Sequence, residues 1–364
     1  MSTMTSNDIH IIKEIATPAG TLAYAPGQAG AAVEGDDTGL TYGAYFDALE
    51  TFLTQDGAAP LVRALTLSGR KSGLAGAREV VLRAEKHGAL YHPASCTVRF
   101  DDGEAKFCVN VAASPVGLQC LEAEAGLLET LRSEFTPEFL PCPYAHGQVG
   151  GLGLLLETWF GGYHEFHQDG QGRVRLWDFD GGERLLAPEA ALALYGESAR
   201  ILTRYFDAAS GASIGPWHHA AGDFVAREAG GVVSARLVTV RGYGASRSFT
   251  EAGPMAERLA GLSFFANMTM RVRLDRVDGV GDLALADVSV AAAAVAGFAA
   301  ALGEREDIGD GGVGLLDFLG SFSAEEMATA GAQLMEPCPP QERELMTMAW
   351  PEHAAALVAA LGRL

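Results

Sequence analysis

The feature that most constrains the fold is a stretch with a period of two residues, which begins at Glu79. Residues 79–85, 91–100 and 106–112 have strand character, and residues 86–88 and 101–103 have the composition of turns. Side chains that alternate in this way point to opposite faces of a sheet. The stretch therefore predicts an antiparallel meander of three strands.

A helix and two more strands are expected after the meander. Leu121, Ala125, Leu128 and Leu131 recur at helical spacing in the stretch that ends at Arg132. An irregular strand, the Gly150-Gly151 turn and an apolar strand at 152–159 follow. Gly161 and Gly162 come directly after this strand and are typical of a hinge.

The chain of 364 residues suits two domains, and we expect their boundary at the hinge. Residues 1–40 are expected to form an N-terminal extension, residues 41–160 a lobe with an antiparallel sheet and one packed helix, and residues 161–364 a mainly helical lobe. Outside the meander, strands are expected at 9–15, 174–179 and 232–240. Helices are expected at 41–53, at 188–206 and over much of the chain after Pro254. The stretch 60–68 is compatible with either a strand or a helix.

Composition excludes several classes of partner. Lys and Arg total 26 against 46 Asp and Glu, a net charge of −20, which disfavours nucleic acids and anionic membranes. The apolar run 288–302 is shorter than the roughly 20 residues of a spanning helix. The five cysteines have no C-x-x-C spacing, and no secretory signal is recognisable at the N-terminus. We expect a cytoplasmic protein with a small-molecule ligand.

Functional side chains are concentrated in residues 216–225. This stretch contains Trp217, His218 and His219, followed by Gly222-Asp223. A turn-forming Pro, two histidines, a Gly-Asp pair and a strand signal come together nowhere else in the chain. We expect a candidate active site centred on Asp223.

The order of these elements resembles the protein-kinase-like fold, in its aminoglycoside-phosphotransferase-like branch. The resemblance covers about residues 79–240. It implies an α+β fold of two lobes, with a ligand cleft between them around Asp223. It also implies ATP and Mg2+ as cofactors.

The resemblance assigns roles to residues of the N-terminal lobe. Asn110 stands where such kinases carry a phosphate-binding Lys, and Glu124 stands where a Glu pairs with that Lys. Asn110 supplies no charge, and a solvated helix position is the alternative for Glu124. Glu157 and Trp159 belong to the hinge strand, where an adenine would take backbone hydrogen bonds.

The turn at 86–93 stands where the family has a glycine-rich loop. It has one Gly, so its backbone would cradle phosphates poorly. Lys86, His87 and His92 would then supply cationic or donor groups, and an exposed hairpin turn is the alternative. The nearby pair His164 and His167 is expected to pack at the hinge.

The catalytic-loop-like segment 216–228 both matches the family and departs from it. Asp223 would be the catalytic residue, with His219 beside it, and Asp223 and Glu228 would hold magnesium. Arg241 stands where the second metal-binding Asp is expected. The alternative is that His219 and Asp223 form a hydrogen-bonded pair that fixes the loop.

Three functions remain open at this point. The chain is either a divergent small-molecule phosphotransferase or a degenerate, pseudokinase-type binding or regulatory module. The third hypothesis is a metal-dependent hydrolase that uses Asp178, Asp180, His218 and His219.

Overall fold

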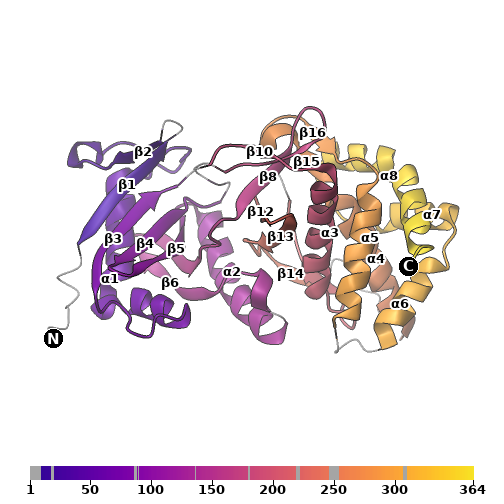
Figure 1. Cartoon of the computed structure of the whole chain (residues 1–364), viewed down its shortest axis with the longest axis horizontal. Helices are drawn as coiled ribbons and strands as arrows, with labels where there is room; N and C mark the ends of the chain where they lie inside the picture. The colour runs from indigo at the N-terminus through magenta and orange to yellow at the C-terminus, as the bar shows by residue number, and fades with distance from the viewer. Residues whose placement is uncertain are drawn as a thin grey trace. The chain divides into compact units, whose positions relative to one another are not determined.

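The computed structural model describes residues 10–17, 20–85, 88, 90–135, 137–178, 181–218, 222–245, 254–305 and 310–364 (Figure 1). The protein is α+β. It divides into two compact units, of which the first comprises residues 1–132 and 141–161 and the second residues 133–140 and 162–364. Each unit has its own sheet and its own helices.

The first unit contains a sheet of seven strands in the order β2-β1-β3-β4-β5-β7-β6. The strands are β1 (Ile11–Thr17), β2 (Gly20–Ala23), β3 (Ala77–Ala84), β4 (Ala94–Phe100), β5 (Gly103–Ala112), β6 (Pro143–Val149) and β7 (Leu152–Thr158). β3 pairs antiparallel with β4, and β4 pairs antiparallel with β5. The predicted meander is therefore confirmed.

The sheet is mixed, so the expectation of a wholly antiparallel sheet was wrong. β1 pairs with β3 in parallel, with Ile11 opposite Val80. Parallel neighbours need a long crossover, and helix α1 (Tyr42–Leu67) lies in the connection between these two strands. Alternation within β1 does not reveal a partner that follows only after this helix. The strands β1 and β2 thus belong to the sheet, although residues 1–40 were expected to form an extension.

Helix α1 covers one face of this sheet. Thr41 caps it, since its side-chain oxygen accepts a hydrogen bond from the Ala44 N–H at 3.4 Å. The helix is interrupted by four non-helical residues at 55–58, and the stretch that begins at Pro60 is helical, which resolves the ambiguity there. Its aromatic residues Phe46 and Phe52 are fully buried in a core shared with the sheet.

Helix α2 (Pro115–Glu134) packs on β7, since a Cβ at Gly153 would lie 2.9 Å from Leu118 Cδ2. Alternation along β5 places Phe107, Val109 and Val111 in the core with α1. The side chains of residues 108 and 110 therefore point to the opposite face of the sheet. The residues of β5 and β7 that were predicted to act on a ligand therefore lie on the sheet face that carries α2.

The second unit contains a sheet of five strands in the order β10-β9-β8-β12-β13. The strands are β8 (His164–Gln168), β9 (Val174–Leu176), β10 (Arg184–Leu185), β12 (Phe224–Ala229) and β13 (Val232–Leu237). The strands predicted around 174–179 and 232–240 are confirmed. The stretch 164–168 was expected to be a loop, but it forms β8, which pairs with β9 on one side and, after helix α3 (Pro188–Arg204), with β12 on the other.

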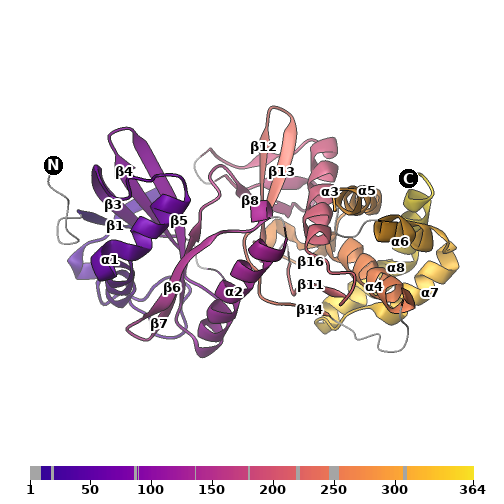
Figure 2. The same cartoon turned by 90° about the horizontal axis from the view of Figure 1, so that it is seen from below.

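The described part of the second unit also contains six α-helices, of which α3 lies beside α5 and against β13 (Figure 2). After α3 come α4 (Pro254–Arg271), α5 (Val290–Gly303), α6 (Asp310–Gly320), α7 (Ala324–Leu334) and α8 (Pro340–Leu361). Short pairs β11 (Ala212–Ile214) with β14 (Tyr243–Ala245) and β15 (Leu274–Arg276) with β16 (Leu283–Leu285) also occur. Among the described residues, no helix is both long and apolar enough to cross a lipid bilayer.

Candidate functional site

Asp223 lies directly before β12 and is 1% exposed. Arg241 holds its carboxylate with two hydrogen bonds, one from Nη1 to Oδ2 and one of 2.5 Å from Nη2 to Oδ1. The backbone N–H of His218 donates to Oδ2 at 2.7 Å. Both carboxylate oxygens are therefore occupied by donors from the chain itself.

This environment suits a structural anion better than a catalytic base. Burial raises the pKa of the Asp223 carboxyl, and the hydrogen bonds from Arg241 and His218 oppose that rise. A general base must accept a proton from its substrate, but the three hydrogen bonds from Arg241 and His218 already occupy most of the roughly four lone-pair positions of the carboxylate. His219, the expected neighbour of Asp223 in catalysis or in a loop-fixing pair, lies outside the described residues.

The expected magnesium pair is not brought together. Glu228 lies within β12, and its carboxylate is 3.7 Å from the Arg184 guanidinium. Five residues of extended chain separate it from Asp223, roughly 16 Å at about 3.3 Å per residue. Two carboxylates that far apart cannot bind one ion, so their assignment as a shared magnesium site is corrected. Among the described side chains no group of three or more His, Cys, Asp and Glu could hold a metal ion.

In the first unit, the structure does bring together the predicted residues Asn110, Glu124 and Glu157. Asn110 Nδ2 donates to Glu157 Oε1 at 2.9 Å, across the paired strands β5 and β7. Tyr91 donates through its hydroxyl to Glu124 Oε2 at 2.9 Å. Glu124 is 1% exposed, so the alternative of a solvated helix position is wrong.

The electrostatics of this group are dominated by two buried carboxyls. Burial raises the pKa of Glu157 well above its usual range, and the nearby charge of Glu124 raises it further. The hydrogen bond from Asn110 opposes the shift. Glu157 Oε2 has no hydrogen-bond partner among the described residues. These surroundings therefore favour the neutral form of Glu157, and the Asn110 amide is already used in a hydrogen bond to it.

The other predicted residues of the first unit have internal partners. Lys106 Nζ lies 4.0 Å from the centroid of the Trp159 ring, a cation–π contact. His92 Nε2 lies 3.1 Å from Asp36 Oδ1, and His92 is 6% exposed. Lys86 and His87 lie outside the described residues. His92 thus ties the N-terminal segment to the sheet, and the exposed turn expected for it is wrong at this position.

A buried cluster around His167 was not predicted. His167 Nδ1 lies 3.2 Å from Asp275 Oδ1, and its Nε2 lies 3.8 Å from Glu165 Oε2. Burial lowers the pKa of His167, but hydrogen bonds and charges from Asp275 and Glu165 outweigh it and raise the pKa to about 9. The ring is therefore an imidazolium at neutral pH. The density of His and Glu at 163–167 was a signal, but it did not reveal Asp275, which lies far along the chain.

The residues of the hydrolase hypothesis are not brought together either. Asp178 Oδ2 lies 3.6 Å from His164 Nε2, and Asp178 Oδ1 accepts a hydrogen bond from the Gly181 N–H at 2.7 Å. His218 Nε2 lies 3.9 Å from Glu342 Oε1, and burial lowers the pKa of His218 to about 4. Asp180 lies outside the described residues, as does His219. Asp178 thus pairs with His164, and its bond to Gly181 is that of a turn residue.

No protein-family model matches this chain, and no curated protein sequence matches it. The chemistry of the described groups therefore decides which function they support.

Proposed function

We propose that this chain is a kinase-like binding or regulatory module that does not transfer phosphate. The observation that carries the proposal is the pairing of Asp223 with Arg241, which stands in the sequence where a metal-binding Asp is expected. A guanidinium at that place neutralises the carboxylate, as a metal ion would. It does not, however, link the carboxylate to phosphate oxygens, which is what a bound metal ion does in such kinases. The partner class is a small molecule.

Support for a kinase-like origin comes from the order of elements in the first unit. Strands β3, β4 and β5 are followed by α2 and then by β6 and β7, with β7 beside β5 in the sheet. That is the order from which the resemblance was inferred. Fold and activity are separable, so the order supports the ancestry and says nothing of catalysis.

Three further observations argue against phosphate transfer. Asn110 carries no charge, and its amide donates to Glu157. Glu228 is paired with Arg184. Phosphoryl transfer relies on positioned cations around the phosphates. Together these contacts favour the module over the divergent phosphotransferase.

The proposal is tested by incubating the full chain with ATP and MgCl2 and measuring both nucleotide turnover and the melting temperature. We expect no turnover above that of a heat-inactivated sample and no stabilisation that requires magnesium. A rise in melting temperature with ATP alone would be the behaviour of a binding module.

Phosphate transfer by the chain would give a different result in the same assay. Magnesium-dependent turnover by the parent chain would contradict the proposal, and its loss in an Asp223→Asn variant that keeps the parent melting temperature would make Asp223 catalytic. Asp317→Asn is the matched control, since Asp317 is an exposed carboxylate of α6 in the same unit. An active small-molecule phosphotransferase in the same assay shows that turnover would be detected.

A further inference from the structure

The side chain of Glu157 contains a buried oxygen that the described residues leave without a donor. Its Oε1 accepts the hydrogen bond from Asn110, whereas its Oε2 has no hydrogen-bond partner among those residues, and Glu157 is 3% exposed. A buried acceptor without a donor is unfavourable, and the common explanation is a group that binds there from outside the chain. Glu157 Oε2 therefore points to a ligand that carries a hydrogen-bond donor.

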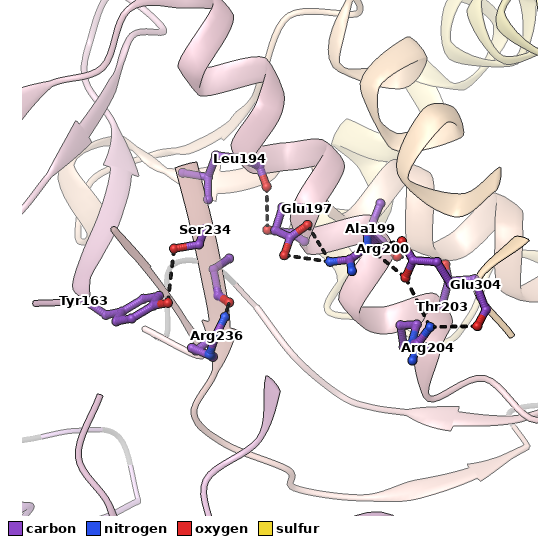
Figure 3. Close-up of polar contacts among 12 residues, drawn as sticks. Tyr163, Leu194, Glu197, Ala199, Arg200, Thr203, Arg204, Ser234, Arg236 and Glu304 are labelled. Atoms are coloured by element: carbon purple, nitrogen blue, oxygen red, sulfur yellow. Dashed lines mark hydrogen bonds and ion pairs between the residues drawn. The ribbon is translucent and has the colours of Figure 1, made fainter. Parts of the chain in front are cut away.

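Other carboxylates that are shielded from water in this protein have a cation beside them. Asp223 is held by Arg241, and the half-buried Glu197 accepts hydrogen bonds from Arg200 at 3.0 Å (Figure 3). Within the part of the chain that the structure describes, Glu157 forms no ion pair with a Lys, Arg or His. The ionised form of Glu157 thus lacks the partner that the other two carboxylates have.

Strand pairing shows from which side a ligand reaches Glu157. Cys108 on β5 lies directly opposite Glu157 on β7. Side chains two residues apart on a strand share a face, so Asn110 is on that face as well. Cys108 and Asn110 are half-buried, whereas Val109 between them is fully buried on the other face. Glu157 therefore lies beneath side chains that are accessible in part.

Helix α2 brings a second carboxylate to Glu157. The charge of Glu124 contributes to the raised pKa of Glu157, so the two groups are close enough to interact. Glu124 accepts the Tyr91 hydroxyl, and the pKa of this hydroxyl is raised by burial and by Glu124, which keeps it a donor. A carboxylate has about four acceptor positions, so one hydrogen bond from Tyr91 does not saturate Glu124.

The remaining ionisable groups around Glu157 leave the potential negative. Burial raises the pKa of the Cys108 thiol well above its ordinary value, and the charges of Glu157 and Glu85 add to the rise, so the thiol is neutral. The Lys106 ammonium lies on the ring of Trp159, at 4.0 Å from its centroid. Carboxylates thus dominate this face beside Glu157, and they favour a cationic ligand.

A primary ammonium group suits these acceptors better than a metal ion. It has three N–H donors, which match Glu157 Oε2, the Glu124 carboxylate and Asn110 Oδ1. Asn110 Oδ1 accepts the weak S–H bond of Cys108 at 3.8 Å and is able to accept a stronger donor. Calcium and magnesium need about six or more oxygen ligands. The described side chains include no group of three or more His, Cys, Asp and Glu that could hold a metal ion.

We propose that Glu157 and Glu124 bind the ammonium group of a small molecule, whose other atoms extend past Cys108 and Asn110. This inference rests on the proposed function, because it gives a chemical class to the small molecule that the module binds. It is tested without nucleotide, so its failure would not alter the conclusion on phosphate transfer. Turnover of ATP, in turn, would not alter the result for ammonium.

Binding should be coupled to the ionisation of Glu157. Burial and Glu124 favour the neutral carboxyl in the free protein, whereas an ammonium beside it favours the carboxylate. Binding therefore releases a proton. The affinity should rise with pH as long as Glu157 is protonated in the free protein, because less work is then needed to ionise it.

The test is calorimetric titration of the full chain at pH 7 with ethylammonium chloride and with potassium chloride. Tetramethylammonium chloride keeps the ionic strength constant, since it has the same charge but no N–H donor. We expect ethylammonium to bind with a Kd tighter than about 10 mM and more tightly than potassium. Absence of ethylammonium binding overturns the proposal, and potassium binding of equal strength overturns the assignment to an ammonium group.

Titrations in phosphate and in HEPES, which differ in ionisation enthalpy, measure the released proton. Glu157→Gln should weaken ethylammonium binding by about ten-fold or more and abolish the proton release. Glu124→Gln should also weaken binding, whereas Glu129→Gln, at an exposed position of α2, should change neither property. Melting curves show that each variant is folded. Binding that survives Glu157→Gln, or that releases no proton in the parent chain, rules out this site.

Discussion

The Arg241 guanidinium forms a two-pronged ion pair with Asp223, whose side chain is completely buried. The pair joins the residue before β12 to the segment that follows β13, and the backbone reinforces it, since Val238 N–H donates to the Asp223 carbonyl at 2.8 Å. Through these partners, Asp223 holds together the two ends of the β12–β13 hairpin. This relationship makes Asp223 a stabilising group of the second unit.

Loss of Arg241 should destabilise the protein strongly. Arg241→Ala leaves a buried carboxylate without its main partner, and breaking a buried pair in this way typically costs about 3–5 kcal/mol. Chemical denaturation followed by fluorescence measures the change in the free energy of unfolding. The double variant Asp223→Ala with Arg241→Ala should recover part of the loss, because no unpaired charge remains. Equal stability of Arg241→Ala and the parent chain would show that the pair contributes little.

Stability should fall with rising pH in a window set by His167. The pKa of its imidazole is raised to about 9 in the folded state by Asp275 and Glu165. Its contribution is therefore fully present below about pH 6.5 and is lost as the pH rises toward 9. A difference of that size between the folded and unfolded pKa values corresponds to about 3 kcal/mol in the free energy of unfolding. Denaturation at a series of pH values measures it.

His167→Gln should remove this part of the pH dependence. Asp275 keeps its hydrogen bonds from the N–H groups of Gln168 and Arg276, at 2.9 Å and 2.7 Å, so it is not left without partners. His146→Gln is the control, because His146 lies partly exposed in the other unit. An unchanged pH profile in His167→Gln would mean that the imidazolium does not stabilise the fold.

Glu157 should oppose folding at high pH. Its pKa is raised in the folded state, so its contribution is present below the ordinary Glu pKa and is lost as the pH rises. Glu157→Gln keeps an oxygen that accepts the Asn110 hydrogen bond and removes the ionisation. The variant should gain at least ~1 kcal/mol over the parent chain at high pH, with a smaller difference near pH 4.

The matched control for this prediction is Glu129→Gln, at an exposed position of α2. It should leave the pH dependence as it is in the parent chain. The same series of denaturation measurements distinguishes Glu157 from His167, because Glu157→Gln should not change the fall in stability that is attributed to His167. If Glu157→Gln lowered stability increasingly as the pH rose, the ionised form of Glu157 would be the one that the fold favours.

Gly279 should not tolerate a side chain. Its φ is +71°, and a Cβ there would lie 2.9 Å from His167 Cδ2 and Nε2. The imidazole is held by Asp275 and Glu165 and cannot move aside. Gly279→Ala should cost about 1–3 kcal/mol, whereas Gly314→Ala in α6, where a Cβ meets nothing within 4 Å, should be neutral or stabilise by up to about 1 kcal/mol. Thermal unfolding of the two variants checks the contrast.

Much of the secondary structure followed from local pattern. The period of two in β3 to β5, the helical spacing in α2 and the Gly150-Gly151 turn before β7 were all confirmed. Each depends on residues close together in the chain. The strand β1 was expected from the sequence, but its parallel pairing with β3 was not, and neither was the pairing of β8 with β12, because an intervening helix separates the partners in both cases.

The contacts within the candidate sites likewise depend on residues that are far apart in the chain. The resemblance assigned Asn110 and Glu157 to a ligand site, and the pairing of β5 with β7 joins them by a hydrogen bond of 2.9 Å that was not predicted. The contact of His167 with Asp275 was not predicted, because nothing near either residue in the sequence indicates the other. The kinase-like fold itself stays a prediction.

The sequence alone determined the α+β class, the meander and the presence of Asp223 in a Gly-Asp loop, since these depend on short-range periodicity and on residue identity. Only the tertiary structure decided what Asp223 does. Its role depends on whether Arg241, which follows the β12–β13 hairpin, reaches its carboxylate. Long-range packing sets that distance, and with it whether a buried carboxylate accepts protons or stabilises the fold.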